Sequence, residues 1–293
     1  MHPAITTSFT YFANDTPPVG IITKIAATLL LALFVVCIIP SHALVREVTI
    51  SGSSTAMPLV EAAAEEFNTR QHDYVVSVTA GGTGAGIMGI AERKFNIAMA
   101  SREITADEKQ RYGDKFLEFK IGVDGICIAV SDKVYQEGVK ALSRDQIKGI
   151  YTGKITNWKD VGGPDEEIYV IAREDGSGTR DTFNKEIFGS EDAETPGVDT
   201  VALGSAEVKT AIAGSDNAIG YLGFNYLGGG VQAIAFDGFM PTHENIKLDL
   251  YELHRHLYLY TYGEPSPGAK AFIEFVQGPE GQRIAGEQGF IPI

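Results

Sequence analysis

Short apolar runs that predict strands alternate with stretches at helical spacing through most of the chain. The strand expected at 48–50 is followed by a helical stretch at 59–67, and the strand at 74–79 by one at 87–93. A strand, a turn rich in Gly, Ser or Thr, and a helix, repeated at this spacing, predict βαβ units and an α/β fold with a mostly parallel sheet. The same patterns predict further strands at 97–100, 125–130, 169–172 and 257–261, and further helices at 142–151, after Arg180, at 269–276 and at 281–285.

An uncharged apolar segment precedes this body. Residues 25–40 follow Lys24 and lead into Ser41, His42 and Ala43. A basic residue, an apolar run and a small-residue exit are typical of a secretory signal, here cut after Ala43. A spanning helix needs about 20 apolar residues, so 21–39 could remain as a single anchor instead. Residues 1–43 are therefore expected to be an N-terminal extension with a signal peptide or membrane anchor, which places the body outside the cytoplasm.

Composition and charge narrow the classes of function. The chain is 44% hydrophobic and 21% charged, which is typical of a soluble globular body. Its formal net charge of −14 repels phosphate backbones at long range, so no nucleic-acid partner is expected. Of the two cysteines, Cys37 lies in the apolar N-terminal segment and Cys127 in the run GICIAV, where a buried, inert thiol is expected.

Candidate ligand chemistry is concentrated in four turns that follow predicted strands, at 51–55, 81–86, 101–102 and 175–179. In an open α/β sheet, ligands bind beyond the carboxyl ends of the strands. Gly lets backbone N–H groups approach a ligand, the helix that follows adds unpaired N–H groups, and hydroxyls add donors. Such a set suits a tetrahedral oxyanion. Each turn by itself is better explained as an ordinary connector with an N-cap, and it is the recurrence of four such turns, with Arg173 and Arg180 beside one of them, that favours a ligand site.

Three other sequence patterns are weaker evidence for a functional site. Residues 84–89 satisfy G-x-G-x-x-G, but no strand that clearly ends in a ribose-binding acid follows about 20 residues on, as a dinucleotide site requires. His254 and His256 could share one strand face, but no third metal ligand has telling spacing. Ser54 or Ser177 could be a hydrolase nucleophile, yet no His is paired with either. We expect no cofactor, no metal and no catalysis.

Six segments together resemble the phosphate-binding proteins of phosphate ABC transporters. The resemblance runs from about Val48 to the C-terminus, and its segments are GSSTAMPL (52–59), the GGTGAG turn (81–86), ASRE (100–103), DGI (124–126), IYTGKITNWKDVGG (150–163) and REDGSGTR (173–180). It implies a class II periplasmic-binding-protein fold, in which two α/β lobes with mixed sheets and helices on both faces are joined by two crossover strands. The ligand cleft lies between the lobes, and the expected lobes are 44–128 with 254–293, and 129–253.

The resemblance also implies which residues contact phosphate. Arg173 would pair with the anion. Asp124, which the resemblance does not itself assign, is either the proton acceptor or an ordinary turn residue at a strand end. In longer family members that acceptor is an Asp directly after the serine of the third turn, where this chain has Arg102. The full expected set is Ser54, Thr55, Thr83, Gly84, Ser101, Arg102, Asp124, Arg173, Ser177, Gly178 and Thr179.

A carboxylate acceptor would provide selectivity. It accepts a hydrogen bond from protonated phosphate but repels sulfate, and two acceptors facing each other in a dry cleft cost several kcal/mol, or ~10³-fold in affinity. The expected partners are inorganic phosphate and the membrane permease and ATPase subunits of a phosphate ABC transporter, and the protein is expected to be a monomer. Two alternatives stay open, a receptor for sulfate, molybdate or tungstate, and a phosphate sensor that feeds no transporter.

Overall fold

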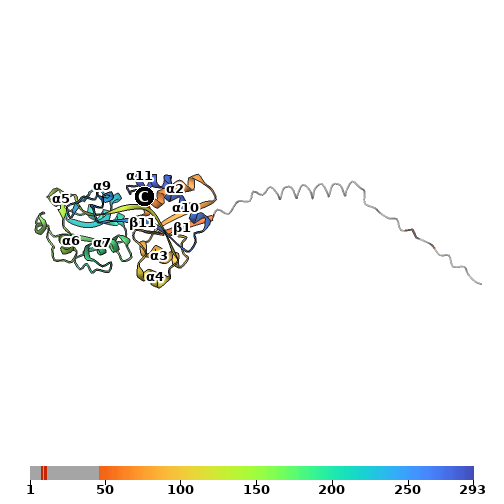
Figure 1. The fold of residues 1–293 in the computed structure, drawn as a ribbon, viewed down its shortest axis with the longest axis horizontal. Coiled ribbons are helices and arrows are strands. Elements are labelled where there is room, and N and C mark those ends of the chain that lie inside the picture. The colour runs from red at the N-terminus through yellow and green to blue at the C-terminus, as the bar shows by residue number, and fades with distance from the viewer. Residues whose placement is uncertain (1–7, 9, 12–45) are drawn as a thin grey trace, which may run out of the picture. The chain divides into compact units, whose positions relative to one another are not determined.

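The computed structural model describes residues 46–293, together with residues 8, 10 and 11 (Figure 1). The signal or anchor predicted within residues 1–43 lies outside the described residues. Within the described part, none of the helices combines the length and the apolar character that crossing a bilayer would require.

The body alternates strands and helices as the sequence pattern predicted. The strands are β1 Arg46–Gly52, β2 Tyr74–Ala80, β3 Ile97–Ala100, β4 Phe116–Ser131, β5 Ala141–Leu142, β6 Tyr169–Arg173, β7 Thr200–Ala202, β8 Ala218–Gly223, β9 Val231–Ala233, β10 Ala235–Phe236 and β11 His254–Tyr262. The helices are α2 Met57–Arg70, α3 Thr83–Ala91, α4 Ala106–Tyr112, α5 Asp132–Gln136, α6 Arg144–Tyr151, α7 Gly178–Phe188, α8 Ser205–Ala213, α9 His243–Lys247, α10 Pro267–Gln277 and α11 Pro279–Glu287, with short 3₁₀ turns at Trp158–Val161 and Phe224–Tyr226.

Most strands belong to one mixed sheet of order β2-β1-β3-β11-β4-β8-β6-β7, with β9 paired to β4. The pairs β1–β2, β1–β3, β6–β7 and β6–β8 are parallel, as βαβ units require. Antiparallel pairs occur where β11 meets β3 and β4, and where β4 meets β8 and β9. The α/β class with mixed strand directions is therefore confirmed, whereas the mostly parallel sheet that the strand–turn–helix pattern predicted is wrong, because the two crossover strands β4 and β11 pair antiparallel with their neighbours.

Strand β4 joins the two halves of the sheet. Its first part, up to Gly125, pairs with β11, and from Ile126 onward it pairs with β8. Strand β11 returns antiparallel to β4, and Asp124 lies opposite Arg255 in their register. These two strands are the crossovers between the lobes.

Each lobe has its own hydrophobic core. In the first, α2 buries Leu59, Val60, Ala63, Ala64 and Phe67 on one helical face, against strand β1 and helices α10 and α11. In Figure 1, α2, α10 and α11 lie on one side of β1 while α3 and α4 lie on the other. The second core draws on β4, β6, β8, α6 and α7. The exact lobe boundaries stay a prediction, which these separate cores support.

Two helices begin several residues earlier than the sequence predicted. Helix α3 starts at Thr83, directly after Gly82, whose φ of 82° turns the chain sharply into the helix. Helix α7 starts at Gly178 because the Ser177 hydroxyl accepts the Arg180 N–H and caps it. As a result, Thr83 and Gly84 of one turn and Ser177, Gly178 and Thr179 of the other belong to helix N-termini.

The expected burial of Cys127 is confirmed. The thiol is free and buried in β4, and burial raises its pKa well above the ordinary value. A thiol in this environment stays protonated and unreactive at neutral pH.

Two glycines of α11 test the packing of the first core. A Cβ added at Gly281 would lie 2.2 Å from the Val276 carbonyl oxygen, whereas at Gly286 the nearest atom, in Pro292, is 3.8 Å away. We expect Gly281→Ala to lower the free energy of unfolding by about 1–3 kcal/mol through overpacking. The matched variant Gly286→Ala is expected to raise it by about 0.5–1 kcal/mol, because alanine favours the helix. Urea denaturation measures both, and equal stabilities for the two variants would contradict the close approach of α11 to Val276.

Candidate functional site

Three of the four Gly-, Ser- and Thr-rich turns lie at one edge of the sheet. They follow β1, β2 and β3, and because β1 pairs in parallel with both neighbours, the carboxyl ends of these strands meet. The fourth turn follows β6 of the second lobe and faces the other three. The Thr55 and Thr179 hydroxyl oxygens, one from each side, are 2.9 Å apart.

Side-chain hydroxyls from both lobes form a compact group here. We call it the hydroxyl cluster, and its members are Ser54, Thr55, Thr83, Ser101, Thr179 and Ser205. All except Ser54, which is half-buried, are almost fully buried. Hydroxyls removed from water need partners, and here they find them in one another and in arginine N–H groups.

Arg173 lies buried at the end of β6 and reaches this cluster. Its Nη1 donates to Ser205 (3.1 Å) and its Nη2 to Ser54 (3.2 Å). The same guanidinium forms a bidentate pair with Glu174, with both N···O distances at 2.8 Å. Arg173 therefore contacts hydroxyls of both lobes and at the same time forms a salt bridge with its neighbour in the chain.

Arg255 of β11 was missed in the sequence. Its Nη2 donates to Thr179 (2.9 Å) and lies 3.0 Å from the Asp124 carboxylate, while its Nη1 donates to the Gly178 carbonyl oxygen (3.1 Å). No local signal marked it, because β11 is a strand of mixed polarity and Arg255 precedes the apolar run at 257–261 from which the strand was predicted. The two histidines on either side of it, His254 and His256, form the more conspicuous pattern.

Ser205 was missed for a different reason. It begins α8, directly after Gly204 and the three-residue strand β7, so it belongs to a fifth turn of the same kind. Such a short strand leaves little periodicity in the sequence. Tyr226, which donates its hydroxyl to the Ser54 carbonyl oxygen (2.8 Å), carried no motif at all.

Arg102 lies next to the cluster but forms its polar contacts elsewhere. Its Nε is 2.6 Å from Asp181 of α7, and its two terminal nitrogens are 2.8 and 2.9 Å from the Glu108 carboxylate. The Arg102–Asp181 pair links the lobes, and both side chains are largely buried. The structure records no hydrogen bond from Arg102 to a hydroxyl of the cluster.

The remaining residues predicted for the site lie at the contact between the two lobes. A Cβ added at Gly178 would be 2.7 Å from both the Ser101 and the Thr83 hydroxyl oxygens, so only glycine permits this approach. The Gly84 N–H donates to the Gly176 carbonyl oxygen across the cleft (3.0 Å). The N-termini of α3, α7 and α8 thus begin at this cleft and add positive dipole ends to it.

Burial opposes both charges of the Asp124–Arg255 pair. It raises the pKa of Asp124 and lowers the pKa of Arg255, while the attraction between the two groups works against each shift. Asp124 also accepts the Phe224 N–H at 3.3 Å. The pair therefore holds two charges in a dry region only because each has a partner.

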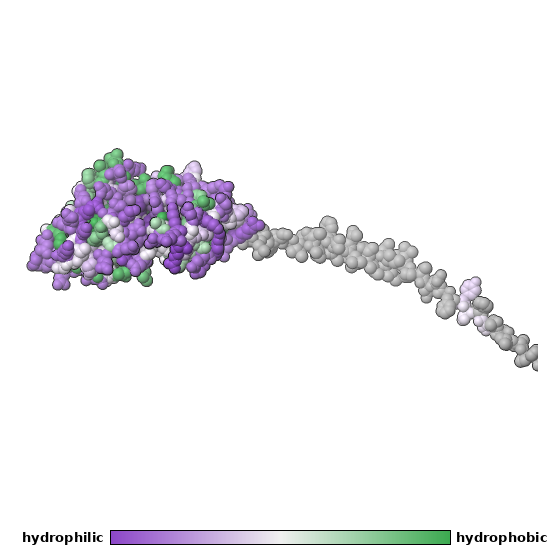
Figure 2. Space-filling view, turned by 60° about the horizontal axis from the view of Figure 1, so that its bottom comes forward, coloured by the Kyte–Doolittle hydropathy of each residue, from purple (hydrophilic) through white to green (hydrophobic). Residues whose placement is uncertain are grey.

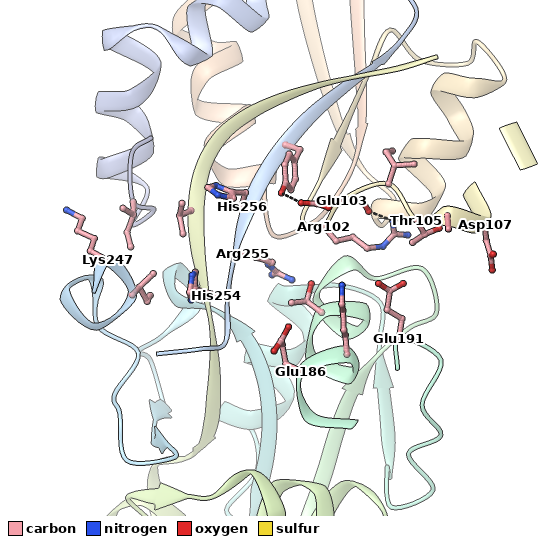
Figure 3. A pocket seen from close by; sticks show the side chains of 18 residues that line it. Arg102, Glu103, Thr105, Asp107, Glu186, Glu191, Lys247, His254, Arg255 and His256 are labelled. Carbon is pink, nitrogen blue, oxygen red and sulfur yellow. Dashed lines mark hydrogen bonds between the residues drawn. The ribbon is translucent and has the colours of Figure 1, made fainter. Parts of the chain in front are cut away.

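A pocket of about 770 Å³ lies beside the cluster, lined by residues of both lobes and of β11 (Figure 3). Arg102, His254, Arg255 and His256 are among its lining residues. The His254 Nδ1 is 2.7 Å from the Tyr251 carbonyl oxygen. Within residues 46–293 and the three isolated positions, no group of three or more His, Cys, Asp or Glu side chains could hold a metal ion.

Comparison with known proteins identifies the family to which this chain belongs. Residues 40–280 match the PBP superfamily domain. The phosphate-binding protein PstS of Bacillus subtilis (strain 168) is 39% identical over 249 residues, which cover 84% of this chain and 80% of that protein. This chain belongs to the phosphate-binding protein family.

Solved structures of this family share the fold. A Clostridium perfringens structure, described as a phosphate ABC transporter substrate-binding protein with bound phosphate, is 38% identical with a TM-score of 0.79, covering 85% of this chain and all of that one. An ABC-type phosphate transport receptor from Vibrio cholerae is 32% identical with a TM-score of 0.69, covering 84% of this chain and 100% of that one. The two-lobe periplasmic-binding-protein fold expected from the sequence is confirmed.

The Arg102–Asp181 pair gives a test of the contact between the lobes. Asp181→Asn removes one charge-assisted hydrogen bond of Arg102 but leaves Glu108 in place, so we expect the free energy of unfolding to fall by about 1–3 kcal/mol. Amide hydrogen exchange in 101–112 and 178–188 should become faster. Asp165→Asn, which removes an exposed pair with Lys159, is the control and should change neither measurement. Unchanged exchange in Asp181→Asn would show that the pair does not hold the lobes together.

Proposed function

We propose that this protein binds inorganic phosphate outside the cytoplasm and delivers it to an ABC-type phosphate import permease. The observation that carries the proposal is the hydroxyl cluster with its buried arginine: Arg173 donates to Ser54 of one lobe and Ser205 of the other. A tetrahedral oxyanion needs many donors around four oxygens, and a cleft between two lobes can surround it. The related Clostridium perfringens structure has phosphate bound in this fold.

The proposed phosphate contacts combine charge and neutral donors. Arg173 supplies charge-assisted hydrogen bonds, and the hydroxyls and the N–H groups at the start of α3 and α7 surround the other oxygens. The set is Ser54, Thr55, Thr83, Gly84, Ser101, Arg173, Ser177, Gly178 and Thr179, to which the geometry adds Ser205. Arg102, whose contacts are with Asp181 and Glu108, is proposed to act at the lobe contact.

The acidic surface does not oppose this function. The net charge of −14 is spread over a surface that water and salt screen, whereas the donors in the cleft are fixed and buried. In a region of low dielectric, preoriented dipoles and guanidinium groups act on an anion more strongly than distant surface charges do. Local donors therefore determine anion affinity here.

Closure of the cleft is the proposed means of capture. Contacts that join the lobes, such as Gly84 N–H to the Gly176 carbonyl and the Tyr226 hydroxyl to the Ser54 carbonyl, form only when the lobes meet. An anion that contacts both lobes stabilises the closed arrangement and shifts the equilibrium toward it. A permease can then recognise the closed form.

Binding without catalysis is the proposed role, in contrast to a hydrolase. The Ser54 hydroxyl accepts from Arg173 and from the Ser205 N–H, and Ser177 caps α7. The structure records no hydrogen bond from a histidine to either serine within its described part, so no general base is placed to activate them. We expect no turnover of a chromogenic phosphate ester.

The protein is further proposed to be a monomer that lies outside the cytoplasm and has the permease and ATPase subunits of the transporter as partners. The face shown in Figure 2 is mostly hydrophilic, with hydrophobic residues in separate small areas, as a soluble monomer would have. A receptor for sulfate, molybdate or tungstate and a sensor that feeds no transporter remain the alternatives.

Calorimetric titration of the purified full chain, stripped of bound anion, tests the proposal. We expect one phosphate per chain, sulfate binding at least about a hundredfold weaker, and an affinity for phosphate that falls at least about a hundredfold in Arg173→Met, which removes the buried cation. Arg283→Met, which changes an exposed arginine of α11, is the control and should bind like the wild type.

Each outcome of the titration decides between the alternatives. Equal binding of sulfate and phosphate would favour the general oxyanion receptor. Binding of neither anion would overturn the proposed function and leave the fold as described.

A further inference from the structure

The two crossover strands carry a buried ion pair where they lie side by side. Asp124 of β4 is opposite Arg255 of β11 in the strand register, and their carboxylate oxygen and Nη2 are 3.0 Å apart. The side chains are 0% and 4% exposed, respectively. An arginine and a carboxylate are rarely buried this completely without a specific task.

Neither oxygen of the Asp124 carboxylate forms a hydrogen bond with a hydroxyl of the cluster. Oδ2 is paired with Arg255 and Oδ1 accepts the Phe224 N–H. A Cβ added at Gly223 would lie 3.1 and 3.2 Å from the two oxygens, so the β8 backbone packs directly against them. Asp124 is therefore enclosed by the crossover region and meets the cluster only through Arg255.

Arg255 itself reaches into the cluster from the crossover strands. Its Nη2 donates to Thr179 at 2.9 Å, and Thr55 of the other lobe is 3.5 Å away. Its Nε is buried with no hydrogen-bond partner, so the guanidinium has donor capacity to spare. Figure 3 shows Arg255 between the crossover strands and the second lobe, at the wall of the pocket.

Two guanidinium groups thus flank three hydroxyls in one continuous chain of contacts. Arg255 donates to Thr179, Thr179 lies 2.9 Å from Thr55, Thr55 lies 3.1 Å from Ser205, and Ser205 accepts from Arg173. Each guanidinium is balanced on its outer side by one carboxylate, Glu174 for Arg173 and Asp124 for Arg255. Two unbalanced cations this close would repel each other in a dry region, which explains why each has an acid behind it.

We propose that Arg255 is a second cationic contact of the bound anion and that Asp124 is a positioning residue that acts through Arg255. This inference rests on the proposed function and replaces the acceptor role that the sequence suggested for Asp124. An anion that displaces the hydroxyls from one another would lie between the two guanidiniums, each held in place by its carboxylate. The choice of the site between phosphate and sulfate then does not depend on Asp124.

The variant Asp124→Asn separates the two roles. If Asp124 only positions Arg255, the affinities for phosphate and for sulfate both fall by a similar factor, about tenfold, because the amide holds the guanidinium less firmly. Their ratio then stays within about threefold of the wild type. If Asp124 accepts a proton from phosphate, phosphate affinity falls while sulfate affinity rises, and the proposal is overturned. Calorimetry on the full chain, with sulfate measured by competition against phosphate, gives both numbers.

Variants of Arg255 test the direct contact. We expect Arg255→Met to lower phosphate affinity at least about a hundredfold, and Arg255→Lys, which keeps the charge but loses the planar fork, to recover part of it. The double variant Arg255→Met with Asp124→Asn should bind no worse than Arg255→Met alone, because Asp124 has nothing left to position. Losses that add in the double variant would show that Asp124 contacts the anion by itself and would overturn the proposal.

Two controls exclude loss of folding and loss of the proposed function. The double variant removes both buried charges, so thermal unfolding should find it at least as stable as Arg255→Met, which leaves a carboxylate unpaired. Arg144→Met removes a partly exposed arginine of the second lobe, paired with Glu252 and Asp237, and should bind phosphate like the wild type. If the wild type bound sulfate in place of phosphate, the proposed function would fail, and the same Arg255 comparison run with sulfate would still decide this inference. Binding of neither anion would overturn both.

Discussion

The arrangement of this protein depends on one constraint: charges and hydroxyls buried between two lobes must all find partners. At the crossing of β4 and β11, Asp124 and Arg255 satisfy each other, and the spare N–H groups of Arg255 extend to Thr179 and the Gly178 carbonyl. Loss of either member would leave an uncompensated charge in a buried region. The pair therefore links the crossover strands, which join the lobes, to the hydroxyls that both lobes contribute.

The rest of the cleft follows from sheet geometry. Because β1, β2 and β3 run in parallel, their turns end at one edge, and each turn leads directly into a helix whose N-terminal N–H groups face the same region. Strand β6 brings Arg173 from the other lobe, and Gly178 lets α7 approach Thr83 and Ser101 closely. A chain with a strongly negative net charge can thus build a local surplus of hydrogen-bond donors, because donors are placed by strand ends and helix starts rather than by overall composition.

The sequence predicted some parts of the fold and of the site better than others. Many strands and helices were predicted near their observed positions, although β4 begins at Phe116 rather than at 125 and α3 and α7 begin earlier than expected. The turns of Thr55, Thr83 and Thr179 were recognised by their residue types. Ser205 escaped because β7 has only three residues, too few for a period to show. Arg255 escaped because nothing local distinguishes a buried arginine from an exposed one in a strand of mixed polarity. Arg102 was predicted by its position in a motif, and the structure directs its guanidinium to Asp181 and Glu108.

By itself, the sequence determined the α/β class, the turns that meet at the cleft and the family to which the chain belongs, because periodicity, glycine-rich turns and motifs are local properties. Tertiary structure alone decided which distant groups became partners. Asp124 and Arg255 are 131 residues apart, and Ser54 and Arg173 are 119 apart. Their pairing depends on strand register and on the closeness of the two lobes, and these arise only when the whole sheet has formed and its polar groups have been removed from water.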